Sequence, residues 1–189
     1  EDIDKLRELF SELEFKSWLA MLEHNHDSKN EPAPSTDGNK TDYKIIQNTD
    51  DWKKYYDKLA NSTVFALDTE TTALDAMQAK LVGVSFALEA NHAVYIPLQH
   101  DPEIVSSQLP LDLFLKDLQT LLNDSSKTII AQNIKYDIKV LARNGIKIKS
   151  NLFDTMLAAY VLNPQSSRLD LETLAQQNLG ISVSSFKDV

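Results

Sequence analysis

The sequence contains no cysteine, and this absence excludes several kinds of structure at once. Without cysteine the chain has no disulfide framework, no thiolate metal site and no cysteine nucleophile. It also has no apolar run approaching the roughly 18 residues that a membrane-spanning helix needs, and its first residues are acidic, unlike those of a signal peptide. We therefore expect a cytoplasmic protein that has no membrane partner.

Positive charge is scarce, with 19 lysine and arginine residues against 28 acidic ones and a formal net charge of −9. Broad, unassisted binding to a phosphate backbone is disfavoured, because its affinity comes from basic side chains that release counterions. An acidic domain can still act on nucleic acid if its carboxylates hold divalent cations, or if a neighbouring basic domain holds the polymer. The hydrophobic content of 42% is enough for a globular core.

The N-terminal part of the chain changes character near residue 23. Apolar residues recur through residues 3–22 with the spacing of an amphipathic helix. Residues 24–41 are rich in Asn, Asp, Ser and Pro and have little apolar area, which predicts a flexible linker. His24 and His26 in this linker are expected to be solvated, since no further metal ligand has suitable spacing.

The remainder reads as an α/β domain beginning near Asp42, with a mixed sheet and helices packed on it. Residues 92–98 follow residues 79–88 after the short loop EAN, so these two strands are predicted to be antiparallel. Asp50 or Asp51 is the predicted cap of the first helix of this domain. The expected strands are 43–48, 63–68, 79–88, 92–98, 127–131 and 146–150, and the expected helices are 50–61, 110–123, 133–144, 153–162 and 169–178.

Two carboxylates, Asp68 and Glu70, follow the apolar run 64–67 at the predicted end of a strand. If the strand persists through Glu70, both side chains project from the same face. Carboxylates on one face can share hard divalent cations, which prefer oxygen ligands. The alternative is that Asp68 caps a turn and Glu70 is only solvated.

A second acidic position lies in the stretch AQNIKYD, residues 131–137. On the helix predicted there, Asn133 and Asp137 are neighbours at i and i+4 beside the apolar row that includes Ile134 and Leu141. They are therefore expected to flank the core. The alternative is an acid that only favours the positive end of the helix dipole.

The order of these motifs carries a resemblance to a known family. LDTETTALD, KLVGVSFAL, AVYIPL, AQNIKYDIKVLARNGI, FDTMLAAYVLNP and the closing SSFKDV together resemble the 3′–5′ proofreading exonuclease domain of bacterial DNA polymerase I. Near the start, LRELFSELEFKSWL is similar to the last helix of the 5′ nuclease domain of that polymerase. The resemblance implies three regions: a helix at 1–23 from the end of a 5′ nuclease domain, a linker at 24–41, and the exonuclease domain at 42–189.

The resemblance implies a ribonuclease H-like fold and a two-metal site. Asp68, Glu70 and Asp137 would be ligands for two divalent cations, either Mg²⁺, Mn²⁺ or Zn²⁺. By analogy Asp68 bridges both ions, Glu70 serves the ion that activates water, and Asp137 serves the other. Such sites hydrolyse a phosphodiester by in-line displacement.

The same resemblance implies a set of substrate-binding residues. Thr69 would supply backbone contacts, while Gln132 and Asn133 match polar groups near the substrate strand. Leu74 and Phe186 match apolar side chains that wedge and stack against terminal bases, although ordinary packing would explain them as well. The implied partners are a single-stranded or frayed 3′ end of DNA and the polymerase domain of the same parent chain, in a bacterial cytoplasm.

One feature of the family is not found in this sequence. The family has a fourth carboxylate and a tyrosine on a helix after the stretch that matches SSFKDV, and the sequence ends at Val189. The exonuclease domain is therefore expected to be incomplete at its C-terminus, and the chain alone to hydrolyse 3′ ends slowly or not at all. Asp154 is expected to cap a helix rather than to replace the fourth ligand.

Two other functions remain open from the sequence. The first is a non-catalytic scaffold of the polymerase, which predicts lost carboxylates, whereas Asp68, Glu70 and Asp137 are present. The second is an RNA exonuclease similar to ribonuclease D, with the same site chemistry. The N-terminal LRELFSELEFKSWL favours the polymerase over this second alternative.

Overall fold

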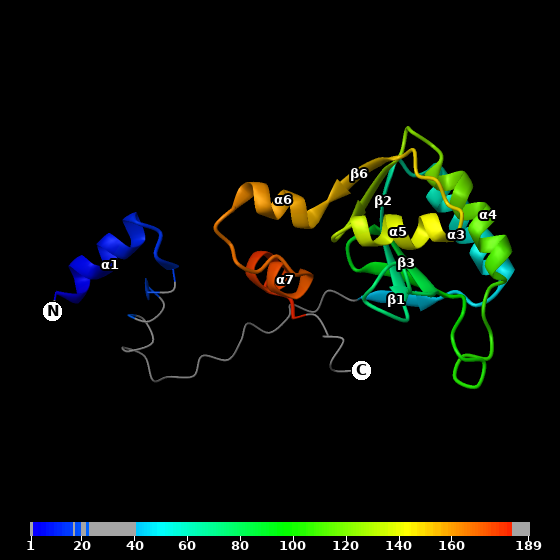
Figure 1. Ribbon diagram of the computed structural model, residues 1–189, viewed down its shortest axis with the longest axis horizontal. Coiled ribbons are helices and arrows are strands. Elements are labelled where there is room, and N and C mark those ends of the chain that lie inside the picture. The colour runs from blue at the N-terminus through cyan, green and yellow to red at the C-terminus, as the bar shows by residue number, and fades with distance from the viewer. Residues whose placement is uncertain (1, 17, 20–21, 23–40, 183–189) are drawn as a thin grey trace. The chain divides into compact units, whose positions relative to one another are not determined.

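The computed structural model describes residues 2–16, 18–19, 22 and 41–182 (Figure 1). His24, His26, Phe186 and all of the predicted linker except Thr41 lie outside these residues. The chain divides into two compact units, Glu1–Ser35 and Thr36–Val189. No helix in the described part of the chain is long and apolar enough to cross a membrane.

In the N-terminal unit, α1 spans Ile3–Glu12 and is capped by Asp2, whose carboxylate accepts a hydrogen bond from the Lys5 N–H. The prediction of one continuous helix over 3–22 was wrong. The helix ends in a turn at Leu13 and Glu14, where Glu14 has a φ of +55°, and helical residues resume at Lys16. The turn lets the Phe15 ring pack against Trp18, with ring centroids 5.0 Å apart.

The second unit is built on a six-stranded mixed sheet with the order β1-β4-β3-β2-β5-β6. β3 is antiparallel to β2 and to β4, as the short EAN loop predicted, while β1–β4, β2–β5 and β5–β6 are parallel pairs. The apolar strand β2 lies inside the sheet, between β3 and β5. The strands are β1 (Asp42–Ile45), β2 (Val64–Thr71), β3 (Leu81–Glu89), β4 (His92–Pro97), β5 (Thr128–Ala131) and β6 (Asn151–Asp154).

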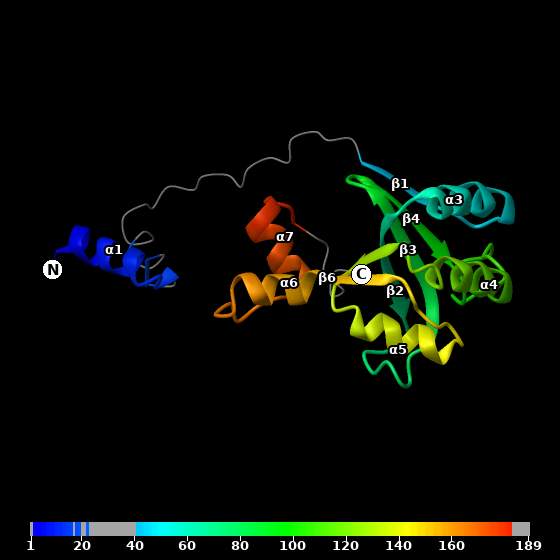
Figure 2. The same cartoon turned by 90° about the horizontal axis from the view of Figure 1, so that it is seen from above.

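Helices α3 (Thr49–Asn61), α4 (Leu111–Leu122) and α5 (Lys135–Arg143) lie along one face of this sheet (Figures 1 and 2). α6 (Thr155–Leu162) and α7 (Leu171–Leu179) follow β6 at the end of the described chain. The N-cap of α3 is Asn48, whose side-chain oxygen accepts the Asp51 N–H at 2.9 Å. The prediction of Asp50 or Asp51 as the cap was therefore wrong.

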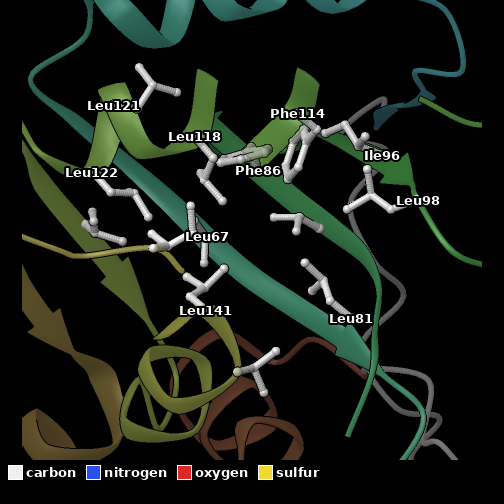
Figure 3. Packing of buried hydrophobic residues seen from close by; sticks show 14 of the residues in the cluster. Leu67, Leu81, Phe86, Ile96, Leu98, Phe114, Leu118, Leu121, Leu122 and Leu141 are labelled. Atoms are coloured by element: carbon white, nitrogen blue, oxygen red, sulfur yellow. The ribbon is translucent and has the colours of Figure 1, made fainter. Parts of the chain in front are cut away.

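The hydrophobic core fills the space between the sheet and these three helices. Figure 3 shows Leu67 and Phe86 of the sheet meeting Phe114 and Leu118 of α4 and Leu141 of α5. All five side chains are buried. This packing fixes β2 and α5 against each other, and these two elements carry the acidic residues.

Two strand boundaries differ from the prediction. β2 continues to Thr71 instead of ending at Asp68, because β3 pairs with it through Thr71 even though the apolar run has ended. The strand predicted at 146–150 lies instead at Asn151–Asp154, where it pairs with β5. Ser150 is buried against the end of α4, and its hydroxyl donates a hydrogen bond to the Asp124 carbonyl at 2.9 Å, so this segment is used for packing rather than pairing.

Candidate active site

The site is built on the last residues of β2, where the two faces of the strand differ. Phe65, Leu67 and Thr69 alternate along the strand and are buried on the face that packs on the helices. Asp68 and Glu70 alternate with them and are exposed. Successive side chains of a strand point to opposite faces, so both carboxylates project from the face opposite the core. The expectation that they share a face is met because the strand persists past Glu70.

This second face of the sheet is hollowed beside Asp68. A cavity of about 340 Å³ lies over the small side chains of β2, β3 and β4. Its lining includes Ala66, Asp68, Ser85, Ala87, Ala93, Gln132, Thr155 and Leu171. A carboxylate at the side of an open hollow is accessible to a ligand.

The third acidic residue, Asp137, reaches β2 from the first turn of α5. Its Oδ1 accepts two hydrogen bonds from Thr69, one from the backbone N–H at 3.0 Å and one from the hydroxyl at 2.6 Å. Asp137 is only 2% exposed. Thr69, which lies between Asp68 and Glu70 in the strand, therefore holds the Asp137 carboxylate in place.

Electrostatic repulsion marks the three carboxylates as neighbours. Burial of the carboxyl group, the largest cause, and the charges of Asp137 and Glu70 together raise the pKa of Asp68 to about 7, against a hydrogen bond from the Thr69 backbone that lowers it. Asp68 keeps contact with solvent, but protein atoms crowd its carboxyl group on the other sides. Near neutral pH this site therefore gathers negative charge, and no basic side chain of the described residues is among the groups that shift the Asp68 pKa.

The pKa of Asp137 is also raised. Burial is the main cause and the charge of Asp154 adds to it, whereas the two hydrogen bonds from Thr69 lower it. These hydrogen bonds stabilise the ionised form, because a buried carboxylate needs donors to replace its lost water. Both Thr69 donors contact Oδ1 of Asp137, so they fix the position of the Asp137 carboxylate.

The chemistry of these side chains fits a hard divalent cation. All three offer anionic oxygens, and a cation would relieve the repulsion that raises the Asp68 pKa. Within the described ranges, however, no three acidic or histidine side chains are grouped closely enough to surround one ion. The arrangement fits an ion such as Mg²⁺, which keeps several waters and binds through one or two carboxylates.

Asp154 caps α6, as the sequence predicted. Its carboxylate accepts hydrogen bonds from the backbone N–H groups of Met156 and Leu157 in the first turn of that helix. It also accepts the N–H groups of Asn133 and Ile134 across the sheet, each at 3.1 Å. Asp154 thus joins the start of α6 to the residues that lead into α5.

Comparison with known proteins identifies the family to which these features belong. A family model described as 3′–5′ exonuclease matches residues 43–188. DNA polymerase I of Pseudomonas aeruginosa is 39% identical over 185 residues, covering 96% of this chain and 20% of the polymerase. This chain belongs to the 3′–5′ exonuclease family of DNA polymerase I. DNA polymerase I of Rhizobium leguminosarum is 39% identical over 141 residues, covering 66% of this chain and 14% of the relative.

The exonuclease chain therefore spans about a fifth or less of the length of these curated relatives. Solved structures share its fold at low sequence identity. Escherichia coli RNase D has a TM-score of 0.59 at 17% identity, covering 76% of this chain and 35% of that one. Brucella melitensis NrnC with bound Mg²⁺ has a TM-score of 0.53 at 22% identity, covering 77% and 64%. The predicted ribonuclease H-like fold is confirmed.

The exonuclease fold places the predicted substrate residues in different settings. Leu74 is 97% exposed on the loop after β2, so it is not a packing residue. Gln132 is engaged within the protein, because its amide donates to the Leu169 carbonyl at 2.7 Å and its oxygen accepts the Thr155 hydroxyl. Asn133 is exposed with a φ of +56°, and α5 begins only at Lys135. Asn133 is therefore not a helical neighbour of Asp137, and that prediction was wrong.

Two residues that anchor the Leu74 loop were missed by the sequence analysis. The Tyr136 hydroxyl donates to the Ala73 carbonyl at 2.5 Å and also contacts the Thr71 hydroxyl. Arg143, about two turns further along the same face of α5, donates to the carbonyls of Ala76 and Ala79. These bonds hold the exposed loop to the helix that carries Asp137, and no local sequence pattern indicates them.

Proposed function

We propose that this chain carries the 3′–5′ exonuclease of a bacterial DNA polymerase I, which removes mismatched 3′-terminal nucleotides from DNA in the cytoplasm. One observation carries the proposal: Asp68 and Glu70 lie on an open sheet face, with Asp137 near enough for its charge to raise the Asp68 pKa. A structural ion cluster would pair these charges with lysine or arginine. A metal-dependent site that hydrolyses phosphodiesters instead leaves its carboxylates without basic partners, so that they can bind cations.

In this proposal Asp68, Glu70 and Asp137 hold two divalent cations, Mg²⁺ or alternatively Mn²⁺ or Zn²⁺. When bound, the cations would lower the pKa of a water molecule and stabilise the oxygens of an in-line displacement at phosphorus. Asp68 would serve both ions, Glu70 the ion beside the attacking water, and Asp137 the other. Thr69 fixes the Asp137 carboxylate through its two hydrogen bonds, so this ligand would not have to be ordered on binding.

The substrate in this proposal is a single-stranded or frayed 3′ end of DNA. Leu74 projects from a loop that Tyr136 and Arg143 hold to α5, and it is free to contact a terminal base. Thr69, Gln132, Asn133 and Phe186 remain proposed contacts to the strand. The net charge of −9 supports a substrate held through cations and base contacts rather than through a basic surface.

The proposal includes the organisation of the parent protein. Residues 1–23 would be the end of a 5′ nuclease domain, 24–41 a linker, and 42–189 the exonuclease domain, with a polymerase domain as partner in the same parent chain. The match to DNA polymerase I of Pseudomonas aeruginosa over 96% of this chain supports it, because that match extends into the N-terminal unit.

The test compares release of nucleotides from 5′-labelled single-stranded DNA and from RNA of the same sequence, with enzyme in excess and with Mg²⁺, Mn²⁺ or EDTA. We expect stepwise shortening of DNA from its 3′ end, lost in EDTA and in Asp68→Asn but kept in the control Asp57→Asn on the exposed face of α3. Preferential degradation of RNA would favour a ribonuclease D-like enzyme. Equal activity in Asp68→Asn would refute the assigned site.

A further inference from the structure

A glycine inside β3 marks a close approach next to the acidic site. Gly83 lies directly opposite Glu70 in the β2–β3 pairing and opposite Pro97 in the β3–β4 pairing. A side-chain carbon at Gly83 would overlap the hydroxyl and outer ring atoms of Tyr95. Glycine within a strand commonly marks such an approach. The end of the Tyr95 side chain therefore lies over Gly83, beside the position from which Glu70 projects.

Tyr95 reaches this position from the neighbouring row of the sheet. Its partner across the β3–β4 pairing is Ser85, which in turn is opposite Asp68. The Tyr95 side chain thus starts in the row of Asp68 and ends over the row of Glu70. The Tyr95 side chain therefore lies beside both Asp68 and Glu70, on the face of the sheet opposite the core.

The Tyr95 side chain is held in place by a loop that follows β4. Its hydroxyl is hydrogen bonded to His100 Nε2 at 2.5 Å, and the two rings meet edge to face with centroids 5.8 Å apart. His100 is itself fixed by Gln108. The Gln108 side chain accepts the His100 backbone N–H at 2.8 Å and donates to the His100 carbonyl at 3.0 Å.

The phenol is close enough to Glu70 to be affected by its charge. Burial, as the larger cause, and the Glu70 carboxylate together raise the pKa of Tyr95 to about 12. Tyr95 is therefore a neutral hydroxyl at the border of the carboxylate pair. Its ring occupies the space over β3 into which the Glu70 side chain could otherwise turn, and the β5–β2 pairing spans Val64–Ala66, well before Glu70.

We propose that Tyr95, fixed by His100, is a positioning residue that keeps the Glu70 carboxylate directed along β2 toward Asp68. This inference rests on the proposed function, in which the two carboxylates hold a divalent cation together. Packing from the side would reduce the number of conformations that Glu70 loses on binding the ion, because a preorganised ligand gives up less conformational freedom. Tyr95 would act through Glu70 and not on the substrate.

The experiment measures the dissociation constant of Mn²⁺ for the intact chain. It uses isothermal titration calorimetry and the loss of the electron paramagnetic resonance signal of free Mn²⁺. We expect Tyr95→Phe and His100→Leu each to raise it about 3- to 10-fold, below the 10- to 100-fold found for groups bonded directly to ligands. Because both act through one hydrogen bond, the double variant should show no more than the larger single effect. Tyr160→Phe, which removes an exposed hydroxyl on α6, should leave Mn²⁺ binding unchanged.

Urea unfolding of each variant separates positioning from folding. A higher Mn²⁺ dissociation constant in Tyr95→Phe supports the proposal if the free energy of unfolding in EDTA equals that of wild type. Mn²⁺ binding within twofold of wild type in both Tyr95→Phe and His100→Leu, or additive losses in the double variant, would overturn it. Asp68→Ala serves as the reference. If Asp68→Ala binds Mn²⁺ as tightly as wild type, the proposed metal site is refuted. If Asp68→Ala binds Mn²⁺ more weakly while the Tyr95 and His100 variants bind it like wild type, only the positioning role is refuted.

Discussion

Replacing Asp68 by asparagine should make the metal-free chain more stable at pH 8. The carboxylate and the amide have nearly the same shape, so the substitution removes charge and leaves the packing of β2 intact. In the folded wild type, burial together with the charges of Asp137 and Glu70 raises the Asp68 pKa from 3.8 to about 7. Above pH 7 the native state therefore carries a charge that its surroundings oppose.

The expected magnitude follows from this pKa difference. A rise to about 7 corresponds to about 4 kcal/mol at roughly 1.4 kcal/mol per pH unit. That value is an upper limit, because Asp68 keeps contact with solvent, which screens the repulsion. We expect the free energy of unfolding of Asp68→Asn to exceed that of wild type by about 1–2 kcal/mol at pH 8.

The sign of the pH dependence is part of the prediction. Between the unfolded pKa near 3.8 and the folded pKa near 7, the native state binds more protons than the unfolded state, so wild-type stability falls as pH rises. The advantage of Asp68→Asn should therefore be small at pH 4, grow up to pH 7 and then level off. Mg²⁺ should reverse it, by stabilising wild type more than the variant.

The assay is urea unfolding followed by circular dichroism at pH 4, 6 and 8, once with EDTA and once with millimolar Mg²⁺. Asp57→Asn on α3 is the matched control, because Asp57 is exposed and is not among the charges that shift the Asp68 pKa. A variant that is less stable than wild type in EDTA at pH 8 would refute the reasoning. An advantage that does not change with pH would refute it equally.

The remaining predictions concern residues around this pair. Thr69→Val should lower the free energy of unfolding by about 1–3 kcal/mol, measured in urea, because the buried Asp137 loses a hydroxyl donor; an unchanged stability would mean that Asp137 finds another donor. Leu74→Ala should leave the urea midpoint unchanged, since the side chain is 97% exposed, and weaken binding of single-stranded DNA in a fluorescence titration; a lower midpoint would return Leu74 to a packing role. Phe186→Ala should also weaken that binding, by roughly 1–3 kcal/mol if its ring stacks on a base, and an unchanged affinity would contradict the stacking role.

The sequence predicted those parts of the fold that depend on local pattern. The spacing of Asp68 and Glu70 predicted that they share a face if the strand continued through Glu70, and the short loop before His92 predicted an antiparallel pair. The pattern could not predict where β2 ends, because β3 extends the strand to Thr71 by pairing with polar residues. It also misplaced the strand at 146–150, where an apolar alternation reflects packing of Ile146 rather than pairing.

The candidate site was predictable in its carboxylates but not in its supports. The hydrogen bonds from Thr69 to Asp137 join residues 68 positions apart, and those from Tyr136 to the Leu74 loop span 63. No local spacing rule reaches that far. The close approach of Tyr95 had a single signal, the isolated Gly83 inside a strand, and that signal does not say which side chain approaches.

The central prediction is that these carboxylates form a divalent-cation site. Crystals of the chain soaked in Mn²⁺ test it directly, because anomalous scattering locates this ion without reference to any assumed ligand. We expect a peak in contact with the Asp68 carboxylate and with an oxygen of Glu70 or Asp137, absent from Asp68→Asn crystals of the same form. A map with no anomalous peak at these three residues, at Mn²⁺ concentrations that saturate the chain in solution, would contradict the account.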